Sequence, residues 1–468
     1  MRKLTGFFFL FFSVITLAQE SLFTLLDNSK TGINFSNDLV DTKQHSIFLY
    51  ANYYGGAGVG IGDFDNDGLD DIFFAANLID DKIFRNLGNF QFEDKTEKSG
   101  IINNGSWSTG VTVADVNNDG LLDIYVSCEL YDDAPILRKN KLYINKGNFK
   151  FEESAEKWGV DVDRRTRHSV FFDYNNDGLL DLYLLNHPPN TGNFSPFFGT
   201  DMTLPEYNLQ LFENKGDYFI DVTIAAGLDR AGFPNAAVIG DFNKDGWADI
   251  YVANDFDAPD FLYFNNQDGS FSYKTESSLR HTSFYSMGVD AADINNDSHL
   301  DLMVLDMTAE DNFRLKSNMS GMNPDSFWNV VKGGGHYQYM FNTMQLNNGN
   351  NTFSDVAQLT GTAATDWSWS SLVADFDNDG NKDIYITNGL LRDIRNTDAD
   401  KKISDIVSKK INEYIINNPD DTDISLWDVV DLEELLDIMP SQKLKNYYYK
   451  NDGNLEFSNI TENSGLNQ

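Results

Sequence analysis

One nine-residue motif occurs six times in this chain and constrains the fold more than any other feature. It reads Asp, any residue, Asp or Asn, any residue, Asp, Gly, any two residues, Asp, and an Ile or Leu follows the last Asp. The copies occupy residues 63–71, 115–123, 173–181, 241–249, 293–301 and 375–383, and the fifth has Ser298 in place of the glycine. Repetition at intervals of roughly 50 to 80 residues predicts a chain built from repeated structural units.

The oxygen-bearing side chains at alternate positions of the motif favour calcium. Ca²⁺ takes six to eight oxygen ligands, whereas Mg²⁺ takes fewer ligands from protein and keeps its waters. A glycine at position six allows a sharp turn with positive φ. We therefore predict about six Ca²⁺ sites, whose side-chain ligands are Asp63, Asp65, Asp67, Asp71, Asp115, Asn117, Asp119, Asp123, Asp173, Asn175, Asp177, Asp181, Asp241, Asn243, Asp245, Asp249, Asp293, Asn295, Asp297, Asp301, Asp375, Asp377, Asp379 and Asp383.

Two other interpretations of the motif compete with this one. An EF-hand needs an acidic ligand at position 12, where a helix begins, but here that position is apolar in every copy: Phe74, Val126, Leu184, Val252, Val304 and Ile386. A metal-free turn rich in Asp and Asn would explain a single copy, but six copies in register favour calcium. The first and sixth loops carry four Asp each at the ligand positions and are expected to bind tightest. The fifth, with Ser298, is expected to be the most strained and the weakest.

Residues 1–18 have the pattern of a secretory signal peptide. A basic start precedes an apolar run and the small residues Thr16 and Ala18, which predicts cleavage before Gln19. We expect a secreted protein, periplasmic or on the cell surface, with no membrane span after cleavage; the apolar run is short for an uncleaved anchor. The net charge of −37 includes many predicted metal ligands and argues against a nucleic-acid partner. Because the lone Cys128 cannot form an internal disulfide, calcium is the expected clamp.

A second pattern accompanies each loop. Apolar β-type runs follow the last Asp, and an aromatic-rich β-hairpin follows further on, at 82–96, 141–155, 209–223, 261–275, 339–357 and 444–461. Each repeat is thus a strand, a calcium loop, a second strand and a hairpin. The fold class predicted from this pattern is all-β, a β-propeller of four-stranded blades spanning residues 19–468. Six or seven blades are compatible with the sequence, and residues 21–37 resemble a lone fourth strand that closes the ring.

The repeats resemble those of a known family. The segments YYGGAGVGIGDFDNDGLDDIFFAAN (53–77) and LYINKGNFKFEESAEKWGV (142–160) are similar to FG-GAP/VCBS repeat proteins, whose blades resemble the calcium-binding propeller of integrin α chains. They look most like the bacterial branch related to cartilage acidic protein. That branch often carries a C-terminal ASPIC/UnbV domain, which this sequence does not show. The resemblance implies a seventh blade, so we expect the C-terminus to be truncated.

The face opposite the calcium loops is the predicted working face. The long insertions, 187–208, 307–340 and 389–443, all follow the second strand of a repeat and therefore rise together on that face. Residues 389–443 have helical spacing and are expected to form two helices that cap the face. Aromatic residues eight positions before a loop, together with polar residues at the ends of second strands, form the predicted ligand-binding mouth: Trp107, Glu129, Asn186, His187, Phe233, Asn254, Asp255, Tyr285, Asp306, Trp367 and Asn388.

These features favour a binding or adhesion module for a glycan or a protein ligand. Aromatic rings suit sugar rings or anchor residues, and amide and carboxylate groups suit hydroxyls; the competing interpretation is that the aromatics pack between blades as core. No catalytic motif is present in the sequence. A carbohydrate-active enzyme, a polysaccharide lyase or hydrolase using His187, is the alternative function. A surface scaffold that binds its partner through the C-terminus is a third.

Overall fold

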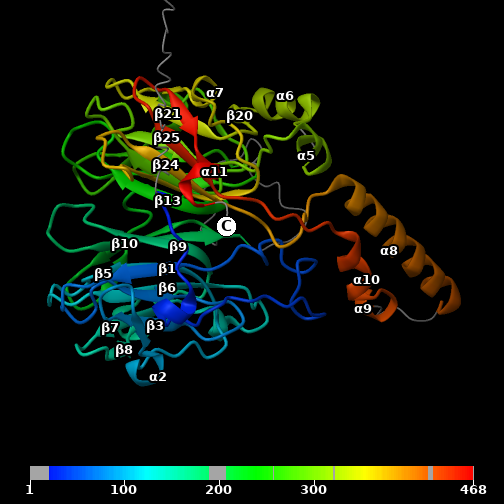
Figure 1. Cartoon of the computed structure of the whole chain (residues 1–468), viewed down its shortest axis with the longest axis horizontal. Coiled ribbons are helices and arrows are strands. Elements are labelled where there is room, and N and C mark those ends of the chain that lie inside the picture. Colours follow the sequence, from blue (N-terminus) through cyan, green and yellow to red (C-terminus); the bar gives the residue numbers. More distant parts are fainter. Residues whose placement is uncertain (1–20, 189–206, 257, 320–321, 420–424, 467–468) are drawn as a thin grey trace, which may run out of the picture.

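Six four-stranded antiparallel sheets follow one another along the chain (Figure 1). The computed structural model describes residues 21–188, 207–256, 258–319, 322–419 and 425–466. The strands of the first three sheets are β1 (Val59–Gly62), β2 (Asp71–Phe74), β3 (Lys82–Asn86), β4 (Phe92–Asp94), β5 (Trp107–Ala114), β6 (Asp123–Glu129), β7 (Lys141–Asn145), β8 (Phe151–Glu153), β9 (Arg165–Phe172), β10 (Asp181–His187), β11 (Gln210–Asn214) and β12 (Phe219–Asp221).

The fourth to sixth sheets repeat the same order of strands. They contain β13 (Pro234–Gly240), β14 (Asp249–Asn254), β15 (Phe261–Asn265), β16 (Phe271–Tyr273), β18 (Val289–Ala292), β19 (Asp301–Val304), β21 (Thr343–Asn347), β22 (Phe353–Asp355), β23 (Ser368–Ala374), β24 (Asp383–Asn388), β25 (Tyr447–Asn451) and β26 (Phe457–Asn459). The predicted fold class, a propeller of four-stranded blades, is therefore confirmed.

Each nine-residue motif is the turn between the first two strands of a sheet. The second strand begins on the last Asp of its motif in all six sheets, and a strand rather than a helix follows, so the loops are not EF-hands. Position six has a left-handed backbone throughout, with φ of 89° at Gly68 and 71° at Ser298. The serine therefore adopts a conformation that is uncommon for a residue with a side chain.

The first strands of all six sheets surround one cavity, of about 240 Å³. Every sheet contributes to its lining, through Gly55, Ala57, Gly58, Val59, Thr109, Gly110, Val111, Arg167, His168, Asn235, Met287 and Trp369. Glycine allows the closest approach of neighbouring sheets: a Cβ on Gly288 would lie against the backbone carbonyl of Trp369 in the next sheet. This cavity is the central channel of the propeller.

The core lies between adjacent sheets rather than within any one of them. One cluster joins Phe73 of the first sheet to Ile124 of the second, and another joins Tyr125 of the second to Leu182 of the third. Three further clusters join the remaining neighbours in the same way. Fully burying such a side chain contributes about 1.5–3 kcal/mol, so the contacts between blades hold the ring together.

In the second to sixth sheets, an asparagine at the end of the third strand links the sheet to the preceding one. Asn145 donates from Nδ2 to the carbonyl of Phe64, in the preceding sheet, at 2.9 Å. Its backbone N–H donates to Asp123 at 2.7 Å. The same bond between sheets runs from Asn214 to Val116, from Asn265 to Tyr174, from Asn347 to Phe242 and from Asn451 to Ile294. We call this bond the asparagine latch.

Short helices lie outside the sheets. α2 (Thr96–Ser99), α3 (Ala155–Trp158), α4 (Thr275–Ser278), α7 (Ala357–Thr360) and α11 (Thr461–Ser464) each follow the fourth strand of a sheet, and α1 (Asn28–Thr31) lies in the N-terminal segment. The long insertion of the fifth repeat holds α5 (Asn312–Ser317), α6 (Pro324–Lys332) and β20 (Gln338–Tyr339), which pairs with β17 (Thr282–Ser283). A 3₁₀ turn, η1 (Pro135–Arg138), precedes β7.

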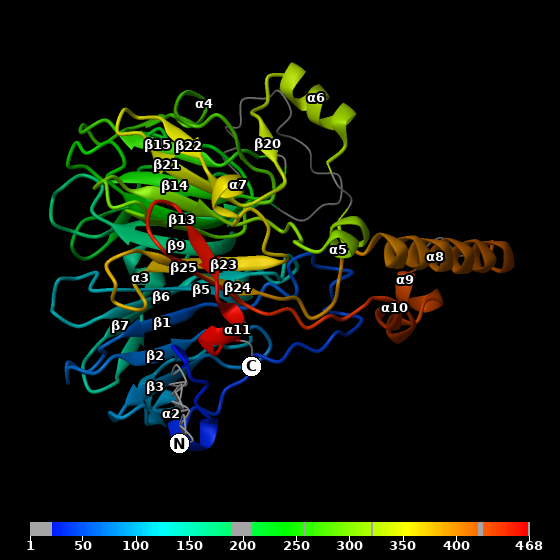
Figure 2. The same ribbon diagram turned by 45° about the horizontal axis from the view of Figure 1, so that its top comes forward.

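The insertion predicted at 389–443 is helical, but only its first part, up to the start of its long helix, lies at the face that it was expected to cap. It contains α8 (Thr397–Asn417), α9 (Leu426–Val429) and α10 (Leu432–Ile438), so the second expected helix is two short ones. α8 stands away from the sheets in both views (Figures 1 and 2). Ile416 near its far end is 77% exposed. Apolar residues at helical spacing predicted the helices, but here they pack α8 against α9 and α10 instead of against the ring.

No helix among the described residues is long and apolar enough to cross a bilayer. The predicted signal peptide and most of the insertion at 187–208 lie outside the described residues.

Candidate functional site

The backbone of each motif is folded around its first aspartate. In the first loop, the N–H groups of Asp67 and Gly68 donate to the two oxygens of Asp63, at 3.0 and 2.7 Å. The equivalent pair of bonds forms in the other five loops. These bonds fix the turn and gather the side chains at positions one, three and five on one side.

The last aspartate of each motif is buried and anchors two strands. Asp71 accepts from the backbone N–H of Phe64 at 2.9 Å and from that of Asn86 at 2.7 Å. Burial raises the pKa of Asp71 to about 6 and that of Asp123 to about 7, although the backbone donors oppose the shift. A cation beside such a carboxylate would offset the cost of burying its charge.

Three carboxylates converge in each of two loops. Oxygens of Asp63, Asp65 and Asp71 lie within 4.8 Å of one another, and so do those of the equivalent residues Asp375, Asp377 and Asp383. In the other four loops position three is Asn, whose amide oxygen is also a calcium ligand. An all-oxygen donor set on a preformed turn fits Ca²⁺ at these positions.

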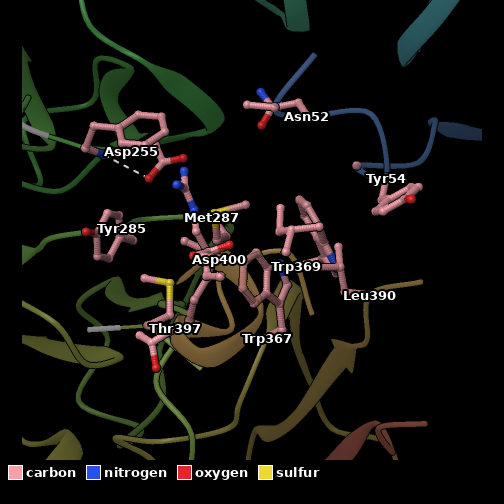
Figure 3. A pocket seen from close by; sticks show the side chains of 17 residues that line it. Asn52, Tyr54, Asp255, Tyr285, Met287, Trp367, Trp369, Leu390, Thr397 and Asp400 are labelled. Carbon is pink, nitrogen blue, oxygen red and sulfur yellow. Dashed lines mark hydrogen bonds between the residues drawn. The ribbon is translucent and has the colours of Figure 1, made fainter. Parts of the chain in front are cut away.

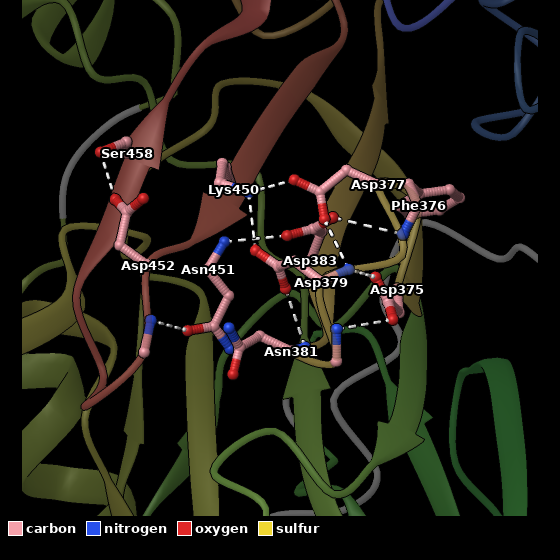
Figure 4. A network of polar contacts seen from close by, with 12 residues as sticks. Asp375, Phe376, Asp377, Asp379, Asn381, Asp383, Lys450, Asn451, Asp452 and Ser458 are labelled. Atoms are coloured by element: carbon pink, nitrogen blue, oxygen red, sulfur yellow. Dashed lines mark hydrogen bonds and ion pairs between the residues drawn. The ribbon is translucent and has the colours of Figure 1, made fainter.

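The two loops with four Asp at the ligand positions also carry a basic partner that was not predicted from the sequence. Arg85 of β3 pairs with Asp65 and Asp67 at 2.7 and 3.0 Å. Lys450 holds the same place in β25 and pairs with Asp377 and Asp379 (Figure 4). The equivalent residues of the other repeats are Ile144, Glu213, Phe264 and Leu346. The extra Asp is thus matched by an extra cation, which removes the charge argument for tighter binding at the first and sixth loops.

A pocket of about 360 Å³ opens at the end of the channel that lies away from the six motif loops (Figure 3). It shares Gly55, Met287 and Trp369 with the lining of the channel, so the two are continuous. We call it the mouth pocket, and its lining residues are Ala51, Asn52, Tyr54, Gly55, Asp255, Phe256, Tyr285, Met287, Met307, Met319, Trp367, Trp369, Leu390, Ile394, Arg395, Thr397 and Asp400.

Three of the residues predicted for the ligand-binding mouth line this pocket: Asp255, Tyr285 and Trp367. The others lie outside its lining, namely Trp107, Glu129, Asn186, His187, Phe233, Asn254, Asp306 and Asn388. Trp107 is 1% exposed because residues before the first sheet cover it, with the Tyr53 ring centroid 5.3 Å from its own.

The polar members of the outlying set are engaged inside the protein. Asp306 accepts from Ser283 Oγ and from the backbone N–H of Tyr285. His187 is buried with Nε2 2.9 Å from the carbonyl of Pro234, and burial lowers its pKa to about 4, so it is neutral at pH 7. Glu129 is 1% exposed, and its Oε2 lies 3.7 Å from Nη1 of Arg167.

The mouth pocket combines aromatic, thioether and charged groups. Burial raises the pKa of Asp255 to about 7, although Arg395, which lines the same pocket, opposes the shift. Trp367 Nε1 is buried with no hydrogen-bond partner among the described residues. Trp369 donates from Nε1 to the carbonyl of Gly389 at 2.6 Å, which fixes its ring. The pocket therefore offers rigid aromatic surface beside a basic and an acidic group.

Two insertions contribute residues to the mouth pocket that the repeat pattern of the sequence does not predict. Met307 and Met319 come from the insertion of the fifth repeat, and Arg395 from that of the sixth. Arg314 of α5 ties both insertions together, because it bonds Asp366 at 2.6 Å and Asp393 at 3.1 Å. Trp369 could have been found from sequence, since it alternates with Trp367 at the start of β23.

Comparison with known families finds FG-GAP-like repeats in three segments of the chain, residues 63–126, 241–304 and 324–386. The expected relation to the ASPIC/UnbV-associated branch is not confirmed. A comparison with functionally characterised proteins gives no match.

Several solved structures are similar in fold. A lectin of Agrocybe aegerita that recognises non-reducing terminal N-acetylglucosamine has a TM-score of 0.43 at 16% identity, over 86% of this chain and 78% of the lectin. The biofilm matrix protein Bap1 of V. cholerae has a TM-score of 0.34 at 14% identity, over 61% and 35%. A GH43 β-1,3-galactosidase has 0.29 at 12%, over 53% and 85%.

Proposed function

We propose that this protein is a calcium-stabilised binding module that holds a carbohydrate in the mouth pocket. The observation that carries the proposal is the pocket itself, with Trp367, Trp369 and Tyr285 beside Asp255 and Arg395. Its volume of about 360 Å³ lies in the range of small-molecule sites. Aromatic faces pack on the apolar faces of sugar rings, and the charged groups orient hydroxyls.

The arrangement of the ring supports different roles for its two faces, stability at one and ligand binding at the other. The six loops lie at one end of the first strands, and the pocket lies at the other end. Removing a metal should therefore change the stability of the protein more than its intrinsic affinity for ligand. The other form of this proposal is that the mouth pocket binds a loop of a partner protein, whose side chains would pack on the same aromatic rings.

The test is glycan-array binding followed by calorimetric titration of the best hit. Trp369→Ala should lower affinity by tenfold or more, because the ring supplies apolar contact area. Trp247→Ala is the matched control, since Trp247 lies in the fourth calcium loop on the opposite face. Binding that survives Trp369→Ala, or an array without any hit, would remove the carbohydrate proposal.

A carbohydrate-active enzyme is the second candidate, and one observation favours it. Asp255, with a pKa of about 7, and Asp400, whose pKa burial also raises, line the same pocket. A carboxyl group that is partly protonated near neutral pH can act as a general acid. Turnover of a uronate or neutral polysaccharide that is lost in Asp255→Asn would support an enzyme. His187 is not the expected acid or base, because it lies outside the pocket.

Two further proposals concern calcium binding and export of the protein. We infer that the loops bind Ca²⁺, with the ligands set out from the sequence, and that residues 1–18 direct export. Metal analysis of the purified protein tests the first inference, and N-terminal sequencing of the mature protein tests the second. A protein that keeps Met1, or that unfolds identically with and without chelator, would contradict them.

A further inference from the structure

Six residues, one from each repeat, form a ring around the central channel. Each stands six positions before the first Asp of its motif, and all six line the channel: Ala57, Thr109, Arg167, Asn235, Met287 and Trp369. Met287 and Trp369 also line the mouth pocket. We call this set the channel ring, and it lies where the channel meets the pocket.

Arg167 is the only charged member of the channel ring. Its side chain is 10% exposed. The guanidinium lies against Gly55, because a Cβ on that glycine would be 2.5 Å from Nη2 of Arg167. Gly55 lines both the channel and the mouth pocket. Arg167 therefore places a positive charge at the junction of the two cavities, in a chain whose net charge is −37.

The guanidinium of Arg167 makes no hydrogen bond with any described residue. Its ion-pair partner in the described part of the chain is Glu129, and the distance of 3.7 Å from Nη1 to Oε2 is too long for a hydrogen bond. Arg165, two residues earlier on β9, instead donates from Nε to Asp132 at 3.0 Å. Since a guanidinium carries five N–H donors in a planar fork, Arg167 has donors available for a ligand.

Glu129 is a distant counter-ion rather than a direct partner. Its Oε2 is buried without a hydrogen-bond partner among the described residues, and so is the hydroxyl of Tyr50, which faces it. The third neighbour is His187, whose Nδ1 lies 3.9 Å from Oε1 of Glu129. Glu129 therefore offsets part of the cost of burying the charge of Arg167 without occupying its donors.

The other basic groups of the two cavities are less suited to an anionic ligand. Arg395 of the mouth pocket faces Asp255 and Asp400, which line the same pocket. His168 lines the channel but is neutral at pH 7, because burial and the charge of Arg167 lower its pKa to about 4. Arg167 is thus the cation whose neighbouring carboxylate is hidden from a ligand in the channel.

We propose that the carbohydrate held in the mouth pocket is an acidic one, and that Arg167 binds its carboxylate at the channel ring. This inference rests on the proposed function and narrows it to sugars that carry a carboxylate, such as uronates and sialylated glycans. A planar guanidinium binds a carboxylate through two parallel hydrogen bonds. Trp369, in the same ring, packs on the sugar, and its hydroxyls lie above, beside Asp255 and Arg395.

The test compares charged and uncharged forms of the same ligand. The probes are uronate oligosaccharides and sialylated glycans on an array, each beside its uncharged methyl ester, and calorimetric titration then gives Kd for both members of the best pair. The protein should bind the acid about tenfold or more tightly than the ester. Arg167→Gln should abolish this preference. Arg230→Gln is the matched control and should keep it, because Arg230 lies over the ring of Tyr273, outside both cavities.

A change at Glu129 should act in the opposite direction. Glu129→Gln removes the carboxylate that competes for Arg167, so the affinity for the acid should rise severalfold. The double variant with Arg167→Gln and Glu129→Gln removes both charges and leaves no buried carboxylate without its counter-ion. It should show no preference for the acid, and it replaces Arg167→Gln in the test if thermal melting shows that the single variant does not fold.

Failure of this inference is distinguishable from failure of the proposed function. Methyl esters or neutral glycans that bind as tightly as the acids would overturn the role of Arg167 and leave a carbohydrate-binding pocket. A preference for the acid that survives in the folded Arg167 variant would also overturn it, because the carboxylate would then bind elsewhere. An array without any hit would remove the proposed function, and this inference with it.

Discussion

The asparagine latch gives the sharpest prediction about stability. Asn145→Ala removes three hydrogen bonds, a buried one to the carbonyl of Phe64 at 2.9 Å and two part-buried ones, to the carbonyl of Leu122 at 3.0 Å and from the N–H of Gly147 at 2.9 Å. The part-buried bonds contribute about 1 kcal/mol each, and leaving the buried carbonyl of Phe64 unpaired costs about 1–3 kcal/mol. We therefore expect the free energy of unfolding to fall by about 3–5 kcal/mol.

Asn86 is the matched control, because it holds the same position in a hairpin of similar sequence. It makes two of these bonds, to the carbonyl of Asp70 at 2.8 Å and from the N–H of Gly88 at 2.9 Å, and it is half-buried. Water can replace these bonds, so Asn86→Ala should cost about 1 kcal/mol.

Urea unfolding in saturating calcium, followed by circular dichroism, measures both values. Equal losses for the two variants would show that the bond between blades contributes nothing, which would refute the reasoning.

Three further predictions follow from the site and the core. Lys450→Met should raise the calcium affinity of the sixth loop severalfold by freeing Asp377, as read by calcium titration, and an unchanged affinity would contradict the compensation argument. Burial raises the pKa of Asp260 to about 7, so its protonated form favours the fold; stability should fall as pH rises from about 4 to 7, and Asp260→Asn should flatten this slope by up to about 1.4 kcal/mol per pH unit. A steeper slope in that variant would mean that another group titrates. Gly288→Ala should cost about 1–3 kcal/mol because its Cβ meets the carbonyl of Trp369, and thermal melting that matches the parent would show that the sheets can separate.

The repeated part of the fold was readable from sequence because each motif fixes a strand boundary. The second strands begin on the last Asp of every loop, as the register of the motif requires, and the hairpins lie where the aromatic runs predicted them. The basic partners Arg85 and Lys450 could also have been found, since an alignment of the six hairpins places both at one position. A count of charged residues inside the loops does not include these two, because they lie in the third strands of their sheets.

The mouth was less predictable because its residues come from segments without periodicity. Distance from a loop along the first strand gives height in the ring, and Trp107 and Trp367 hold equivalent positions by that measure. It gives no information about what covers each residue, and residues 46–54 bury the first while leaving the second in the pocket lining. Arg395 and Met319 reach the pocket through insertions whose path depends on tertiary contacts such as those of Arg314.

Hydrogen–deuterium exchange with and without bound ligand tests the central claim most directly, namely that the two faces of the ring do different work. With the best glycan from the array, the account predicts slower exchange at residues 285–288, 367–369 and 390–400, which surround the mouth pocket. Exchange in the six nine-residue motif loops should not change. Protection confined to the loops, with none at the mouth, would contradict the account.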